Sequence, residues 1–134
     1  MVRMELSRIV FSENSDQQII FLKEANGKRG FPIVIGNFEA RQIYDNVKQI
    51  KYPRPLTHDL IENIMNSFKI SLSRIEITEL KNNTFYARLI MKMNGQEMPV
   101  DARPSDAIVM ATKLGVPIDV HEEILAGFAD PLPE

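Results

Sequence analysis

The chain has 134 residues, of which 44% are hydrophobic and 25% charged, a composition typical of one globular domain with a single core. Its net charge of -2 at pH 7 and its pI of about 5.7 argue against a dedicated duplex-DNA binder, which is usually basic, so any contact with nucleic acid must be local. The absence of cysteine excludes disulfides, thiol catalysis and cysteine-ligated zinc, and the lack of a signal peptide or of an apolar run of ~20 residues predicts a cytoplasmic protein that does not span a membrane.

The first part of the chain alternates between apolar and polar residues. This alternation predicts strands at residues 2–11 and 18–25, joined by a polar turn, and a short buried strand at residues 31–36. Residues 39–50 then carry apolar side chains at a helical period. Prolines within residues 51–55 end this helix, because proline cannot continue it.

A second helix is predicted from Thr57, as its N-cap, through an apolar stripe that reaches Phe68. Three strands follow, at residues 74–80, 84–93 and 96–101. The last two are joined by an Asn-Gly pair, the strongest hairpin signal in the chain.

Alternation in the return strand predicts that Met98 and Val100 face inward. A third helix is predicted from Pro104, which suits its first position, to Leu114, with Gly115 as the C-cap. Pro104 and Gly115 therefore mark the start and the end of this helix.

The chain closes with a short extended piece at residues 116–120, a short helix at 121–128 and a loose tail at 129–134. Residues 1–128 are therefore predicted to form one α+β domain. In this domain a mixed or antiparallel sheet carries three to four packed helices.

Two helix starts carry related polar sequences. Arg54-Pro55-Leu56-Thr57-His58-Asp59 opens the second helix, and Asp101-Ala102-Arg103-Pro104-Ser105-Asp106 opens the third. Each reads Arg-Pro, then a hydroxyl residue, then Asp. A helix start holds polar side chains on a rigid scaffold while its backbone N–H groups point outward, so both are treated as one candidate site.

Several blocks of the sequence closely resemble the bifunctional nuclease domain family. They are Pro32-Ile33-Val34-Ile35-Gly36 with Glu39-Ala40, the two helix starts above, Thr84-Phe85-Tyr86-Ala87, and Pro117-Ile118. The resemblance covers about the whole chain. It implies a hydrolase that cleaves both RNA and DNA, an activity described for plant members of the family.

Two chemical routes could serve such an activity. His58 and His121 could act as acid and base with the ribose 2′-OH as nucleophile, but this route cannot cut DNA. Cleavage of both polymers needs an activated water, usually supplied by a divalent ion held by carboxylates, and hard oxygen ligands suit Mg²⁺ or Mn²⁺. The candidate metal ligands are Asp59, Asp101, Asp106 and Glu39, and the candidate catalytic residues are His58, Asp59, Asp101 and Asp106.

The substrate expected at this site is single-stranded or flexible nucleic acid. Arg54 and Arg103 are candidates for bidentate contacts with phosphate. Lys51 and Tyr52 offer one further phosphate contact and one aromatic ring on which a base could stack.

Each candidate also has a purely structural interpretation. Asp59 and Asp106 lie in first helical turns, where the helix dipole favours a carboxylate by ~0.3–1 kcal/mol without any function. Arg54 and Arg103 could simply pair with these aspartates and hold the turns, and Thr57 is more typical of a helix cap than of a catalytic hydroxyl.

Two other functions therefore stay open. One is a non-catalytic binding or assembly module that forms a homodimer or a higher homo-oligomer, with the strand face of Met91 and Met93 as a candidate packing surface. The other is a small-molecule sensor that uses the two Arg-Pro turns as a cradle for an anion.

Overall fold

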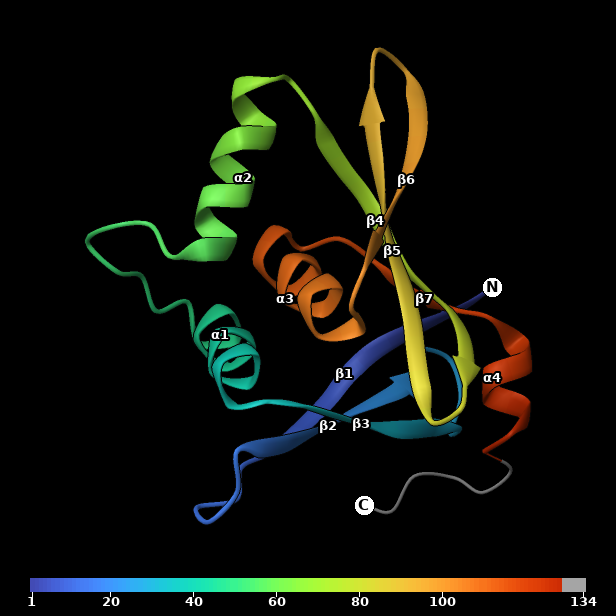
Figure 1. Cartoon of the computed structure of the whole chain (residues 1–134). Coiled ribbons are helices and arrows are strands. Elements are labelled where there is room, and N and C mark those ends of the chain that lie inside the picture. Colours follow the sequence, from blue (N-terminus) through green and yellow to red (C-terminus); the bar gives the residue numbers. More distant parts are fainter. Residues whose placement is uncertain (129–134) are drawn as a thin grey trace.

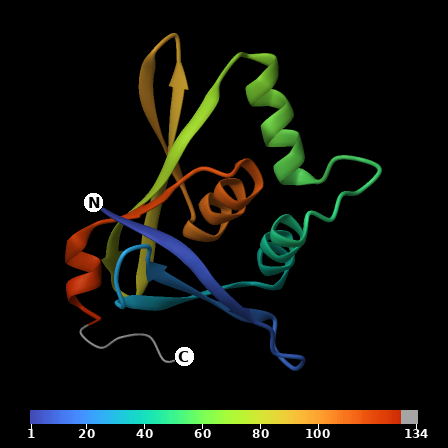
Figure 2. The same ribbon diagram turned by 180° about the vertical axis from the view of Figure 1, so that it is seen from behind.

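The computed structural model describes residues 1–128. Its elements in chain order are β1 (Val2–Val10), β2 (Gln17–Glu24), β3 (Gly30–Gly36), α1 (Asn37–Lys48), α2 (Thr57–Ser67), β4 (Ser71–Lys81), β5 (Thr84–Met93), β6 (Gln96–Ala102), α3 (Pro104–Leu114), β7 (Ile118–Val120) and α4 (Glu122–Ala126). Figures 1 and 2 show a sheet that curls around α3, with α1 and α2 beside α3 and α4 lying away from both. The α+β class predicted from the sequence is confirmed.

The sheet joins two antiparallel meanders through one short strand. Its strand order is β3-β2-β1-β7-β4-β5-β6. The three-residue strand β7 pairs antiparallel with β1 and parallel with β4, and all three of its residues are buried. The sheet is therefore mixed, and the predicted extended piece near residue 118 is the strand that makes it continuous.

The core lies between the concave face of the sheet and the helices. Helix α3 is buried over residues 107–111, because it is covered by β4 and β5 on one side and by α1 on the other. Phe31 is fully buried and stacks on Phe85 and Phe128, with ring centroids 5.4 and 5.1 Å away. These rings connect the N-terminal meander to the other end of the chain.

Both edge strands differ from the sequence prediction. The strand predicted as buried at residues 31–36 is the edge strand β3, in which alternate residues such as Pro32 and Val34 are exposed. An edge strand tolerates the missing N–H of a proline. At the opposite edge, Met98 and Val100 of β6 pair with the core residues Met91 and Leu89, so they lie on the inward side of the sheet as predicted, but both are exposed because β6 is the outermost strand.

Helix α2 begins one residue away from the expected cap. Its N-cap is Leu56, not Thr57, and the carboxylate of Asp59 accepts a hydrogen bond from the Leu56 N–H at 2.8 Å. A carboxylate in the first turn therefore accepts the hydrogen bond from the free N–H group at the start of the helix, and the threonine hydroxyl does not cap it. Of the predicted apolar stripe, Met65 is buried, whereas Phe68 at the C-cap is exposed.

Within residues 1–128 no helix has the length and apolar character that crossing a bilayer requires. The predicted tail at residues 129–134 lies outside the described residues.

Candidate functional site

The starts of three helices are joined by a chain of hydrogen bonds through Arg103 and Asp106. The Arg103 guanidinium donates from Nη2 to Oε1 of Glu39 in α1 at 2.9 Å and from Nε to Oδ2 of Asp106 in α3 at 2.8 Å. The other oxygen of Asp106, Oδ1, lies 2.9 Å from Nε2 of His58 in α2. We call Glu39, His58, Arg103 and Asp106 the three-helix cluster, and all of its members except Glu39 come from the two helix starts predicted as one site.

Local sequence explains why these side chains lie at helix starts. Pro104 occupies the first turn of α3, where its missing N–H has no helical partner to lose, as predicted. Gly36 is the N-cap of α1, and a Cβ built there would lie only 2.9 Å from Oε2 of Glu39. The glycine therefore leaves room for the Glu39 carboxylate to fold back over the start of the helix, where the helix dipole favours it.

The surroundings of His58 and Asp106 determine which of the two donates the hydrogen bond between them. Partial burial raises the pKa of Asp106, but hydrogen bonds from Arg103 and His58 outweigh this effect and hold the pKa below its ordinary value. Because an ionised carboxylate can only accept, Nε2 of His58 is the donor. His58 is buried, and its Nδ1 has no hydrogen-bond partner among the described residues. The imidazole therefore orients Asp106 rather than facing solvent.

Acid is expected to weaken this arrangement. The folded-state pKa of Asp106 lies below the unfolded one, so its stabilising contribution is present above the unfolded pKa and is lost as the pH falls through the folded pKa. Urea unfolding at neutral pH and near pH ~3 should show a smaller loss of stability in Asp106→Asn than in the wild type. Equal losses of stability in the two proteins would contradict a stabilising role of the ionised Asp106 carboxylate.

Asp59 faces a different neighbour. Its Oδ1 accepts from Nζ of Lys113 in the last turn of α3, and Glu62 lies 3.5 Å from the same ammonium group. The hydrogen bond from Lys113 lowers the pKa of Asp59. Asp59 thus turns away from the three-helix cluster and forms part of the wall of a groove.

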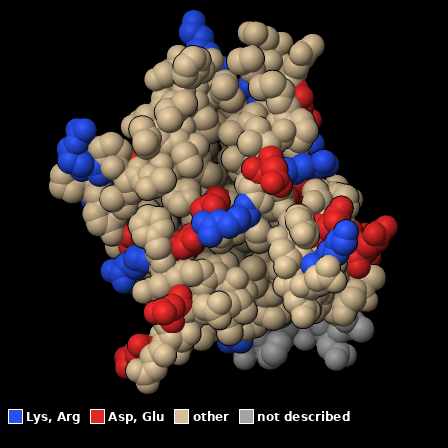
Figure 3. Space-filling view, in the orientation of Figure 1, with Lys and Arg blue, Asp and Glu red and all other residues tan. Residues whose placement is uncertain are grey.

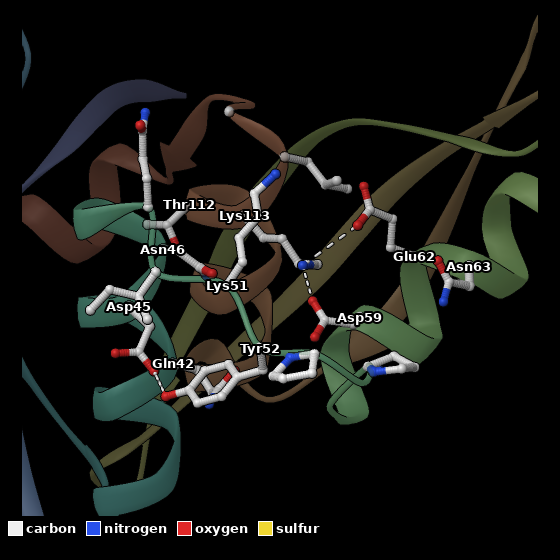
Figure 4. Close-up of a pocket in the computed structure, with 16 residues that line it drawn as sticks. Gln42, Asp45, Asn46, Lys51, Tyr52, Asp59, Glu62, Asn63, Thr112 and Lys113 are labelled. Atoms are coloured by element: carbon white, nitrogen blue, oxygen red, sulfur yellow. Dashed lines mark hydrogen bonds and ion pairs between the residues drawn. The ribbon is translucent and has the colours of Figure 1, made fainter.

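This groove, of about 850 Å³, lies between α1, the segment 49–55, α2 and the end of α3 (Figure 4). Lys51 and Tyr52 line it, as does Asp59. The Tyr52 hydroxyl donates to Oδ2 of the buried Asp45 at 2.5 Å, and this bond raises the pKa of Tyr52. Tyr52 therefore ties the segment to α1, in addition to lining the groove.

The structure does not bring Asp101 or Arg54 to the cluster. Asp101 pairs in register with Arg88, whereas its neighbour Ala102 packs against the core, so alternation along β6 turns Asp101 to the opposite face of the sheet. There it lines a second, smaller groove with Arg88. Arg54 is exposed, and no ion pair joins it to Asp59 within the described residues.

His121 lies elsewhere, as the N-cap residue of α4. Figure 1 shows this helix on the side of the molecule away from α1 and α2. The two histidines that would serve the 2′-OH route are therefore not neighbours.

A divalent ion held by the protein needs several oxygen ligands close together. Among residues 1–128 no three His, Asp or Glu side chains gather as a ready-made metal site. Glu39 and Asp106 do form a pair of hard oxygen donors around one exposed guanidinium. Their oxygens are of the type that Mg²⁺ and Mn²⁺ prefer, and Oε1 of Glu39 and both oxygens of Asp106 accept hydrogen bonds from Arg103 and His58 in this structure.

Sequence reasoning missed three residues near these sites. The position of Glu62 beside Asp59 could have been predicted, since the two are three positions apart on the same helix face. Lys113 binds Asp59 although the two are 54 positions apart in the chain, and no local sequence pattern predicts that contact. Phe38 stacks on His58 with ring centroids 6.2 Å apart, another contact that depends on how two helices meet.

Comparison with known proteins agrees with the resemblance seen in the sequence. The model of the bifunctional nuclease domain family matches residues 20–131. An uncharacterized protein of Mycobacterium tuberculosis is 44% identical over 111 residues, which are 83% of this chain and 66% of that protein. Bifunctional nuclease 1 of Oryza sativa subsp. japonica is 27% identical over 96 residues, 69% of this chain and 29% of that protein.

Bifunctional nuclease 2 of the same rice is 22% identical over 116 residues, 84% of this chain and 36% of that protein. The chain thus spans about two thirds of the mycobacterial relative and a smaller part of the rice proteins. The family match, which covers more than half of the chain, shows that the chain belongs to the bifunctional nuclease domain family.

Proposed function

We propose that this protein hydrolyses phosphodiester bonds in single-stranded or flexible RNA and DNA at the three-helix cluster. The observation that carries the proposal is Arg103, whose side chain is 66% exposed although two carboxylates hold its position. A fixed and accessible guanidinium matches the geometry of a phosphate. Family membership and the names of the rice relatives support the class of reaction.

Each member of the cluster has a role in this proposal. Arg103 binds the phosphate, and Asp106 and Glu39 would hold a Mg²⁺ or Mn²⁺ ion. When bound, this ion supplies a water of lowered pKa as the nucleophile. His58 is a positioning residue, because its hydrogen bond keeps Asp106 ionised and oriented. We expect this chemistry in the cytoplasm, in keeping with a chain that has no cysteine.

The groove beside the cluster extends the proposed binding surface. The first turn of α2 separates the two, with His58 on the cluster side and Asp59 on the groove side. Lys51 in the groove wall and Arg54 in the adjoining loop are proposed to contact phosphates on either side of the bond that is cut.

The proposal is tested by cleavage of labelled single-stranded RNA and DNA with Mg²⁺, with Mn²⁺ and with EDTA. Glu123→Gln is the matched control for the substitution Asp106→Asn in the cluster, because it removes an exposed carboxylate of α4 instead. Cleavage of both polymers that needs metal and is unchanged in the control would support hydrolysis by an activated water. Cleavage of RNA alone, indifferent to EDTA, would move the chemistry to His58 and the 2′-OH. No cleavage of either polymer would refute the proposal.

A second candidate function, self-assembly, is favoured by the outer face of α2. Leu60, Ile64 and Phe68 follow one another at intervals of four residues and are 52%, 49% and 68% exposed. The exposed residues between Leu60 and Phe68 carry no charge, and Figure 3 shows few charges over α2 and the β5–β6 hairpin. The expected packing surface at Met91 is not available, because Met91 is buried in the core.

We propose that this uncharged face pairs with its copy in a homodimer, since an isologous interface must match itself. Ile64→Glu is expected to convert the dimer to a monomer, because it places two like charges across the interface. Light scattering after size exclusion measures the mass of each form. Asn63→Glu, a neighbouring exposed position, tests whether the apolar stripe itself is the contact, and a wild type that is monomeric at all concentrations would refute the dimer.

A further inference from the structure

The ring of Phe38 lies at the margin of the three-helix cluster and is 51% exposed. Phe38 is in the first turn of α1, next to Glu39, and its ring stacks on the imidazole of His58 with an angle of 24° between the planes. Glu39 is bonded to Arg103, and His58 is bonded to Asp106. A large apolar ring is therefore exposed directly beside a charged site.

Core packing does not account for this ring. Phe38 belongs neither to the buried core of the described residues nor to the partly buried side chains that pack against it. Its aromatic contact within residues 1–128 is the one with His58. That contact is offset, with ring centroids 6.2 Å apart, and the exposed part of the Phe38 ring can gain from a planar partner, because covering apolar surface is favourable.

We propose that Phe38 is a stacking platform for the base of an unpaired nucleotide whose phosphate is bound by Arg103. The inference rests on the proposed function and names the form of substrate that the site takes. Every nucleobase has a π-face, so stacking on a phenyl ring tolerates any base sequence. A base within a duplex is already stacked and paired, so only single-stranded or locally opened nucleic acid can use the platform.

The chemistry of the ring also sets what the platform cannot do. Phenylalanine has no hydrogen-bonding group in its side chain, so it cannot read the edges of a base. We therefore expect similar affinity for different single-stranded sequences and weaker binding of duplexes. The phosphate contact of Arg103 adds a salt-dependent part to the affinity that does not depend on Phe38.

The test measures binding apart from hydrolysis. The dissociation constants of a short labelled oligothymidylate and of an abasic oligomer of equal length are measured by fluorescence anisotropy in EDTA. Phe38→Leu, which keeps an apolar cover over His58, is expected to weaken binding of the oligothymidylate about 5- to 100-fold. Phe38→Trp is expected to bind it as well as the wild type does. All three proteins should bind the abasic oligomer alike.

Several results would overturn the inference. They are equal affinities of the wild type and Phe38→Leu for the oligothymidylate, an equal loss in Phe38→Leu and Phe38→Trp, or no measurable binding by the wild type. Thermal unfolding of each variant shows that it is folded before binding is compared. Cleavage assayed on the same preparations separates the two proposals: Phe38-dependent binding without cleavage supports the platform and refutes hydrolysis, and cleavage without Phe38-dependent binding does the reverse.

Discussion

Asp106→Asn is expected to slow the cleavage of single-stranded DNA by about 10²–10⁴-fold while the protein stays folded. The amide has nearly the same shape as the carboxylate, but it removes the negative charge that Arg103 and His58 both contact. It also leaves the divalent ion with one carboxylate in place of the two that we propose. Single-turnover rates with saturating Mg²⁺ or Mn²⁺ measure the effect, and thermal unfolding checks the fold.

His58 variants show whether the imidazole acts through Asp106. His58→Gln keeps an N–H donor and is expected to retain most of the activity, whereas His58→Phe removes the donor and should lose about 10- to 100-fold, as partners of metal-ligating groups usually do. In the Asp106→Asn background, His58→Phe should cause little further loss, because the two residues act as a unit. Additive losses would contradict the positioning role.

Phe31→Ala is expected to lower the free energy of unfolding by about 3–5 kcal/mol, the largest effect on stability that we predict. Phe31 is fully buried, and its ring stacks on Phe85 of β5 and on Phe128 beyond α4. Truncation would leave a cavity where the curled sheet brings the edge strand β3 against β5. Urea or thermal unfolding measures the loss.

The matched control is Phe11→Ala. Phe11 is exposed at the end of β1 and meets only the edge of Tyr44 among aromatic rings of residues 1–128, with centroids 5.9 Å apart. Its loss should cost about 0.5–1.5 kcal/mol. Comparable losses at the two positions would show that Phe31 is not the centre of the core that its burial indicates.

Local signals in the sequence predicted most of the elements correctly. The Asn94-Gly95 turn joins β5 and β6, Pro104 opens α3, and Gly115 caps it with a left-handed φ of 68°. These features depend on a few neighbouring residues, so the sequence contains them. The cap of α2 was misplaced because Asp59 and Thr57 offer competing oxygens within three positions, and only the folded turn decides between them.

Features that depend on distant contacts could not be predicted in this way. The apolar period of α2 shows which residues share a face, but not that Ile64 and Phe68 lie on the outside. Likewise, the sequence places Asp101 five residues before Asp106, yet the strand ends between them and Asp101 turns to the other face of the sheet. The two helix starts were grouped correctly for His58 and Asp106, which are 48 positions apart in the chain and bonded in the fold.

The central claim is that the three-helix cluster, and not the opposite face of the sheet, is the hydrolytic centre. It is tested most directly by comparing Asp106→Asn with Asp101→Asn in parallel preparations on the same single-stranded DNA. The structure predicts a loss of about 100-fold or more for Asp106→Asn and activity close to that of the wild type for Asp101→Asn. Loss of activity in Asp101→Asn with activity retained in Asp106→Asn would contradict the claim.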